Sequence, residues 1–126
     1  MIANKKNLSI LLVDDNQHFR DALKYMVEEV VHENINIYQA SSGNEALDII
    51  RKQHIDLVFM DIEMPDMTGI EATRRVTEIN RFITVIALSF HQEMQYIMQM
   101  LEAGARNYII KEEINKETIK KVLEVK

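Results

Sequence analysis

Five short apolar runs alternate along the chain with longer segments in which apolar residues recur at every third or fourth position. Short runs rich in Ile, Leu and Val favour buried strands. Phe19, Leu23, Met26 and Val30 have the spacing of an amphipathic helix whose apolar face lies against a sheet. The predicted strands are residues 8–13, 35–40, 56–60, 83–88 and 107–110.

Two of the predicted helices have the sequence signature of a capping box at their start. Ser42 is followed three residues later by Glu45, and Thr68 is followed in the same way by Glu71. In such a box the hydroxyl and the acid satisfy two free backbone donors reciprocally. We therefore predict helices that begin near positions 43 and 69.

Two further helical patterns occupy the C-terminal part of the chain. Met94, Ile97, Met98 and Leu101 form an apolar stripe, and we interpret the methionines as core residues that face the sheet rather than as a partner surface. Residues 116–125 form the last predicted helix, which has its apolar residues on one side. Each predicted strand is thus followed by a helical segment.

This alternation predicts an α/β protein with a parallel five-stranded sheet, doubly wound so that helices cover both faces. Its crossover connections should be right-handed. A chain of 126 residues, 47% of them hydrophobic, corresponds to one domain with a proper core. In such a fold a ligand crevice forms outside the carboxyl ends of the strands, where the direction of winding reverses.

Composition and charge argue against several function classes. The chain has no cysteine, no apolar stretch near the roughly 20 residues of a membrane span, and no apolar signal-peptide core at its start. We therefore expect a cytoplasmic protein without a membrane segment. A net charge of −5, with no basic stripe, argues against direct nucleic acid binding by this chain.

Three acids end two of the predicted strands. Asp14 and Asp15 follow the first strand, and Asp61 follows the third. Neighbouring parallel strands would bring these carboxylates together, where each pair about 4 Å apart repels by about 4 kcal/mol at an effective dielectric near 20. A compensating cation is needed, and a site with only oxygen ligands suits Mg²⁺, with Mn²⁺ as an alternative, better than zinc or copper.

The fourth and fifth strands add a hydroxyl and an amine at the same edge, from Ser89 and Lys111. Such a set suits phosphoryl transfer to a carboxylate, with Asp61 as the nucleophile because it stands alone on its strand. Ser89 would donate a hydrogen bond to the transferred group, and Lys111 would pair with it. Taken singly, these residues could instead be helix caps or solvated surface groups.

Four stretches of the sequence, residues 13–15, 61–69, 87–89 and 103–111, resemble the receiver domains of two-component response regulators. The similarity runs from about Leu8 to the end. It implies a CheY-like, flavodoxin-type (βα)5 fold with strand order 2-1-3-4-5, and one receiver domain over residues 1–126 with no output domain. The matching motifs are most similar to those of receivers of the NarL/LuxR type, whose DNA-binding output domains control transcription.

The resemblance also implies a mechanism. Asp61 would accept a phosphoryl group from a sensor histidine kinase, while Asp14, Asp15, Asp61 and the backbone carbonyl of Glu63 hold the magnesium ion. Lys111 would assist the transfer. A receiver of this kind catalyses only its own modification, so we do not expect an enzyme that turns over a separate metabolite.

A switch is implied as well, made of Ser89 and Tyr108. In the family the hydroxyl moves toward the phosphoryl group and the aromatic ring turns inward, which changes the face used by a partner or by a second copy in a dimer. On residues alone, Tyr108 could be an ordinary strand aromatic. The sequence leaves open whether the chain is the regulatory part of a transcription factor or a stand-alone receiver.

Two positions depart from the usual receiver pattern. Phe90 follows the switch hydroxyl, where a small residue is common, so we expect a bulky ring to restrict access to the site. Glu112 follows Lys111, where many receivers have a cis-proline, so we expect a trans peptide bond or a differently shaped loop there.

Three other functions compete with this interpretation. A haloacid-dehalogenase-like phosphatase would need an Asp-x-Asp motif, whereas these acids are adjacent. A flavodoxin-like module would need a phosphate-cradling loop after Val13, and that loop is acidic. A phosphate-independent interaction module would typically lack one of the acids.

Overall fold

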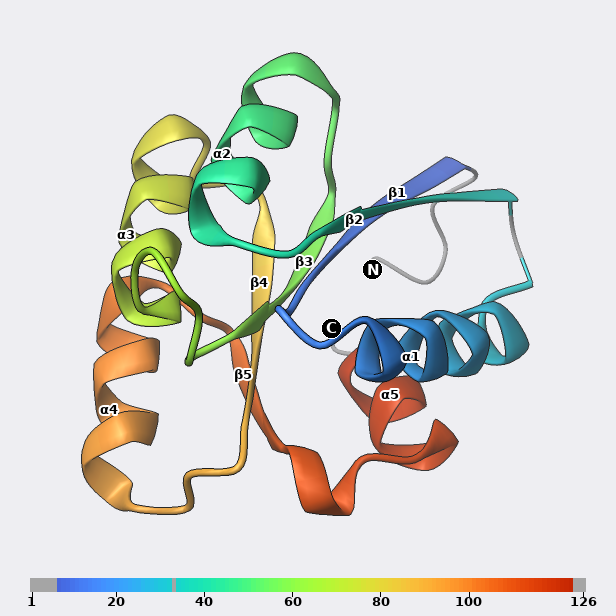
Figure 1. Ribbon diagram of the computed structural model, residues 1–126. Coiled ribbons are helices and arrows are strands. Elements are labelled where there is room, and N and C mark those ends of the chain that lie inside the picture. Colours follow the sequence, from blue (N-terminus) through green and yellow to red (C-terminus); the bar gives the residue numbers. More distant parts are fainter. Residues whose placement is uncertain (1–6, 33, 124–126) are drawn as a thin grey trace.

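The computed structural model of the protein describes residues 7–32 and 34–123. Five parallel strands form one sheet in the order β2-β1-β3-β4-β5, which confirms the predicted fold class and strand order (Figure 1). Their bounds lie within one residue of the predicted ranges. The strands are β1 (Asn7–Val13), β2 (Asn34–Ala40), β3 (Leu57–Asp61), β4 (Thr84–Ser89) and β5 (Asn107–Ile110).

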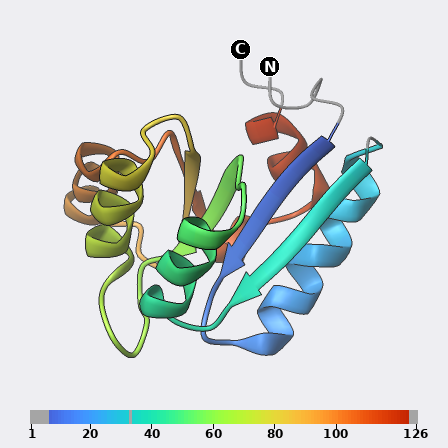
Figure 2. The same cartoon turned by 90° about the horizontal axis from the view of Figure 1, so that it is seen from above.

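Helices cover both faces of this sheet (Figures 1 and 2). One face carries α1 (Gln17–Val30) and α5 (Lys116–Leu123), and the other carries α2 (Gly43–Lys52), α3 (Gly69–Ile79) and α4 (Met94–Ala103). A short 3-10 turn, η2 (Lys111–Glu113), joins β5 to α5. Of the predicted last helix, residues 124–125 lie outside the described part of the chain.

Side chains of β1, an interior strand of the sheet, alternate between two apolar layers. Leu8, Ile10 and Leu12 pack toward α1 and α5, whereas Leu11 and Val13 pack in the opposite layer. All are buried, and each such side chain contributes about 1.5–3 kcal/mol by leaving water. A strand buried on both faces is consistent with its continuous apolar sequence.

The predicted capping boxes form only in part. Ser42 and Thr68 cap α2 and α3 as predicted, since each hydroxyl accepts the backbone N–H of the residue three positions on. The predicted return hydrogen bonds, from the backbone N–H of each cap residue to Glu45 or Glu71, were wrong. Glu45 accepts the N–H of Ser41, one residue earlier, and Glu71 pairs with Arg75 on its own helix. The guanidinium of Arg75 competes with the backbone N–H for the Glu71 carboxylate.

The buried face of α4 was also predicted wrongly. Met94, Met98 and Leu101 are exposed, while Met100 and Ala103 pack in the core. Most positions of this helix are apolar, so spacing alone did not select the face that contacts the sheet. The series on α1 is confirmed, with Leu23 fully buried among partly buried neighbours.

No helix in the described ranges 7–32 and 34–123 combines the length and apolarity that crossing a membrane requires.

Candidate functional site

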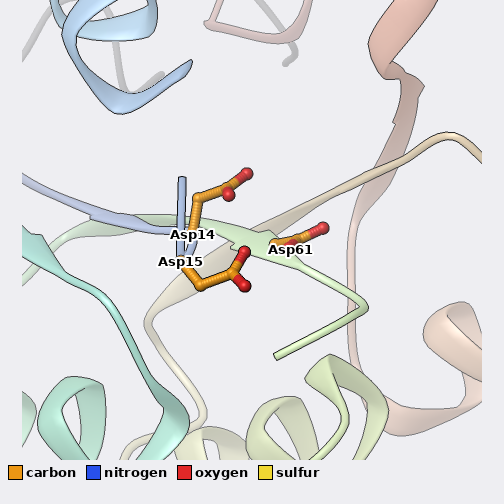
Figure 3. A group of neighbouring side chains, drawn as sticks. All are labelled: Asp14, Asp15 and Asp61. Atoms are coloured by element: carbon orange, nitrogen blue, oxygen red, sulfur yellow. The ribbon is translucent and has the colours of Figure 1, made fainter. Parts of the chain in front are cut away.

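The carboxyl ends of β1 and β3 meet at the point where the sheet reverses its winding, and three acids gather there. Asp14 and Asp61 are buried, whereas Asp15 is exposed. One carboxylate oxygen from each acid lies within 4.8 Å of the other two (Figure 3). The structure thus brings together the three acids that the sequence places at strand ends.

Lys111 reaches into this acidic cluster from the first residue of η2. Its Nζ lies 2.5 Å from Asp14 Oδ2 and 3.1 Å from Asp61 Oδ1, and its side chain is 7% exposed. Burial by itself lowers the pKa of Lys111, but its hydrogen bond to Asp14 and the charges of both acids outweigh it, so the pKa is raised. The peptide bonds of the described residues include no cis bond, so Lys111 is aimed at the acids without a cis-proline after it.

Its surroundings raise the pKa of the Asp61 carboxyl well above the ordinary value. Burial raises its pKa most, and the charge of Asp14 raises it further, while Lys111 opposes both; the resulting pKa is about 6. One ammonium cannot balance three carboxylates held this close. The donor set is entirely oxygen, which fits a hard divalent cation.

Cation binding should therefore depend on pH. Below about pH 6 a proton occupies Asp61, so we expect the apparent Mg²⁺ affinity to fall as pH drops from 7.5 to 5. Titration of Mg²⁺ into the protein, followed by amide NMR at pH 5, 6 and 7.5, measures this. In Asp61→Asn the pH dependence should be much weaker; equal slopes in the two proteins would show that Asp61 does not compete with protons for the cation.

Ser89 and Tyr108 lie on the neighbouring strands β4 and β5, and both contact His91. The Ser89 hydroxyl accepts the backbone N–H of His91 at 3.0 Å, and the Tyr108 hydroxyl donates to the His91 carbonyl at 2.9 Å. Burial raises the pKa of Tyr108. The two predicted switch residues are therefore tied to the same segment between β4 and α4.

The sequence pattern assigned His91 no role in the site. Its ring stacks on Tyr96 with centroids 4.1 Å apart, and its Nε2 lies 3.3 Å from a carboxylate oxygen of Glu63. The contact with Glu63 joins two loops that are far apart in the sequence, so no local spacing signals it.

Glu63 lies on the loop that follows Asp61, and its side chain is exposed. Its backbone contributes a hydrogen bond to the Asp61 carboxylate. The predicted metal-binding role of its carbonyl stays a prediction. The same loop is tied to α2 by Asp66, whose carboxylate accepts the N–H groups of Gly43 and Asn44 at 2.9 and 2.7 Å.

Two phenylalanine rings border the site. Phe90 is 59% exposed, and its ring centroid lies 5.3 Å from Lys111 Nζ; its role in restricting access stays a prediction. Phe19, which the sequence indicated only as a helix residue facing the core, has its centroid 4.5 Å from the same atom. An ammonium this close to a ring face is attracted by it.

Comparisons with a family model and with known proteins point to the same family. A family model for the response regulator receiver domain matches residues 10–124. The chain is 35% identical over 124 residues to sporulation initiation phosphotransferase F of Bacillus subtilis, covering 95% of this chain and 97% of that protein. It is 30% identical over 109 residues to the transcriptional regulatory protein DegU of Brevibacillus brevis, covering 86% of this chain and 46% of DegU.

Solved structures agree with the fold. The chemotaxis protein CheY4 of Vibrio cholerae superimposes with a TM-score of 0.83 at 25% identity, covering 93% of this chain and 96% of that one. The chain spans about half the length of DegU and of the response regulator UvrY of Escherichia coli. Its strand order, its clustered acids and the matched family together show that the chain belongs to the response regulator receiver domains.

Proposed function

We propose that this chain receives a phosphoryl group on Asp61 from a sensor histidine kinase and acts as a signalling switch. The observation that carries the proposal is the convergence of Asp14, Asp15, Asp61 and Lys111 in one largely buried cluster. Three negative charges and one positive charge suit a site that takes a divalent cation together with a phosphoryl group. The receiver modifies itself and turns over no separate metabolite.

The transfer is a displacement at phosphorus. An Asp61 carboxylate oxygen forms a bond to phosphorus as the phosphorus–nitrogen bond of the kinase phosphohistidine breaks, and the imidazole nitrogen keeps the electron pair. Asp61 must be ionised to attack, and at neutral pH it is, because its pKa is about 6. Lys111, already 3.1 Å from Asp61, would pair with the charge on the phosphoryl oxygens.

The cation would be held by Asp14, Asp15 and Asp61, with the Glu63 carbonyl completing the oxygen ligands. Mg²⁺ is preferred and Mn²⁺ is an alternative. When bound, the cation supplies charge neutralisation at the phosphoryl oxygens.

Ser89 and Tyr108 would convert the modification into a change of surface. Ser89 is buried at the end of β4, one residue beyond Leu88, which is the register partner of Asp61 on β3. It would turn its hydroxyl from the His91 N–H toward the phosphoryl group. Tyr108 would follow by leaving the His91 carbonyl. The altered face would bind a partner or a second copy of the chain.

We infer one receiver domain over residues 1–126 that works in the cytoplasm and does not itself bind nucleic acid. Two settings remain open. The likeness to DegU supports an attached output domain that controls transcription, whereas the likeness to sporulation initiation phosphotransferase F over 97% of its length supports a stand-alone receiver. The mass of the natural protein in its own cells, compared with 14.8 kDa for this chain, separates the two.

Incubation with acetyl phosphate or phosphoramidate and Mg²⁺, read by intact mass, tests the proposal. We expect one added phosphoryl group in the unmodified protein and none in Asp61→Asn. Chelation of the cation should prevent uptake. A second arm uses the cognate kinase, because Phe90 could hinder one small donor. Absence of uptake from both donor classes, or unchanged uptake in Asp61→Asn, would contradict the proposal.

Phe90→Ala should shorten the lifetime of the phosphorylated state several-fold. The exposed ring covers the side of the site near Lys111, and removing it admits water to the acyl phosphate. The decay of the added mass after removal of the donor measures the effect. Phe82→Ala, which removes another exposed ring, is the matched control and should decay like the unmodified protein. Equal decay in Phe90→Ala would count against an access role.

A further inference from the structure

The Lys111 ammonium has aromatic as well as carboxylate neighbours. Its Nζ lies 4.5 Å from the ring centroid of Phe19 and 5.3 Å from that of Phe90. Both distances lie within the about 6 Å over which a ring face attracts a cation. Because the Lys111 side chain is 7% exposed, water screens these interactions weakly.

Phe19 is anchored to the same acid that binds Lys111. One carboxylate oxygen of Asp14 accepts the N–H of Asn16 at 2.9 Å, and the side chain of Asn16 accepts the N–H of Phe19 at 3.0 Å. The other carboxylate oxygen of Asp14 accepts a hydrogen bond from Lys111. The interactions thus close a loop from Asp14 through Asn16 and Phe19 to Lys111.

Of the two rings, Phe19 is the better placed to hold the ammonium. It is closer, and it is only partly exposed because it also packs against the core beneath α1. Phe90 is farther away and 59% exposed, so it is freer to change its orientation. A ring face attracts the ammonium but has no oxygen to accept a directed hydrogen bond from it. The ring therefore does not replace the carboxylate or phosphoryl partners of the ammonium.

We propose that Phe19 is a positioning residue for phosphoryl transfer, because its ring holds the Lys111 ammonium beside Asp61 and keeps water from it. The inference rests on the proposed function of Asp61. When the Asp61 oxygen becomes bonded to phosphorus, Lys111 has to pair with the charge on the phosphoryl oxygens. The ring contact keeps the ammonium at the site while these partners change.

A series of fluorinated phenylalanines at position 19 tests this directly. Each fluorine weakens the attraction of the ring face for a cation while nearly preserving its shape. We expect the rate of phosphorylation by phosphoramidate in Mg²⁺ to fall stepwise along the series, by about 2- to 30-fold in total, which corresponds to the usual strength of such contacts. Fluorination of Phe82, an exposed ring whose cation neighbour is Arg81 rather than Lys111, is the matched control and should leave the rate unchanged.

Substitutions and NMR complete the test. Phe19→Leu should slow the reaction, and Phe19→Tyr, which keeps a ring, should restore most of the rate. In the unphosphorylated protein, Phe19→Leu should also remove a ring-current shift from the ε-methylene protons of Lys111. A flat fluorine series, or no ring-current shift, would overturn the role of Phe19. Failure of the unmodified protein to take up phosphate would instead refute the role of Asp61, and the NMR result would still decide whether Phe19 contacts Lys111.

Discussion

Asp61→Asn is expected to make the metal-free protein more stable at neutral pH while abolishing phosphoryl uptake. The pKa of Asp61 is about 6 in the folded protein, against 3.8 for the ordinary carboxyl, so the folded state holds the ionised form at a cost. A difference of about two pKa units corresponds to about 3 kcal/mol. Since asparagine also gives Lys111 a weaker partner, we expect a gain of about 1–3 kcal/mol.

The pH dependence of this gain follows from the direction of the shift. Below pH 3.8 the carboxyl is protonated in both states and costs nothing. Between about pH 4 and 6 the unfolded state loses its proton while the folded state keeps it, so the stability contribution of Asp61 falls as pH rises. Above about pH 6 the penalty is constant. The difference in the free energy of unfolding between Asp61→Asn and the unmodified protein should therefore increase between about pH 4 and 6.

Urea unfolding followed by circular dichroism at pH 4 and pH 7 measures this difference. Asp15→Asn is the matched control, since Asp15 belongs to the same cluster but is exposed, and its effect should be smaller. Added Mg²⁺ should stabilise the unmodified protein and reduce its deficit relative to Asp61→Asn. Lower stability of Asp61→Asn at pH 7 would contradict the electrostatic description of the site.

Gly69→Ala should destabilise the protein strongly and displace the phosphoacceptor. A Cβ at Gly69, the first residue of α3, would lie 2.0 Å from the carbonyl oxygen of Asp61 and 2.8 Å from Cα of Ile62. These are backbone atoms, so neither a rotamer change nor a small shift relieves the contact. Alanine in a helix usually stabilises relative to glycine, but this clash should cost about 3 kcal/mol or more.

Gly43→Ala is the matched control, because Gly43 is likewise the first residue of a helix. Its added Cβ would meet side-chain atoms of Met67, which can rotate away, so we expect a loss under about 1 kcal/mol. Urea midpoints give the two stabilities, and the rate of phosphoryl uptake by the folded fraction of Gly69→Ala reports on the displacement of Asp61. Similar stability of the two variants would show that the helix α3 can move away from β3 at little cost.

Much of the fold could be predicted from residue patterns, because the five buried strands of a doubly wound sheet are continuous apolar runs. The ends of those strands located Asp14, Asp61, Ser89 and Lys111 at one edge. The strand order could not be predicted from the residue pattern alone. Alternation of strands and helices alone is compatible with several orders, and 2-1-3-4-5 came from the resemblance to receivers.

Other features depended on contacts that no local spacing encodes. The exposed face of α4 was mistaken for its buried face because apolar residues surround most of that helix. Phe19 reaches Lys111 from the other end of the sequence, and His91 joins Ser89 to Tyr108 through its backbone, which any residue type provides. Glu71 was diverted from capping by Arg75.

The central claim is that Asp61, and no other acid of the cluster, carries the phosphoryl group. Borohydride reduces an aspartyl phosphate to homoserine, so reduction of the phosphorylated protein followed by peptide mass mapping locates the modified side chain. We expect homoserine at position 61 and unchanged aspartate at positions 14 and 15. Homoserine at either of those positions, or a phosphorylated protein in which position 61 remains aspartate, would contradict the account.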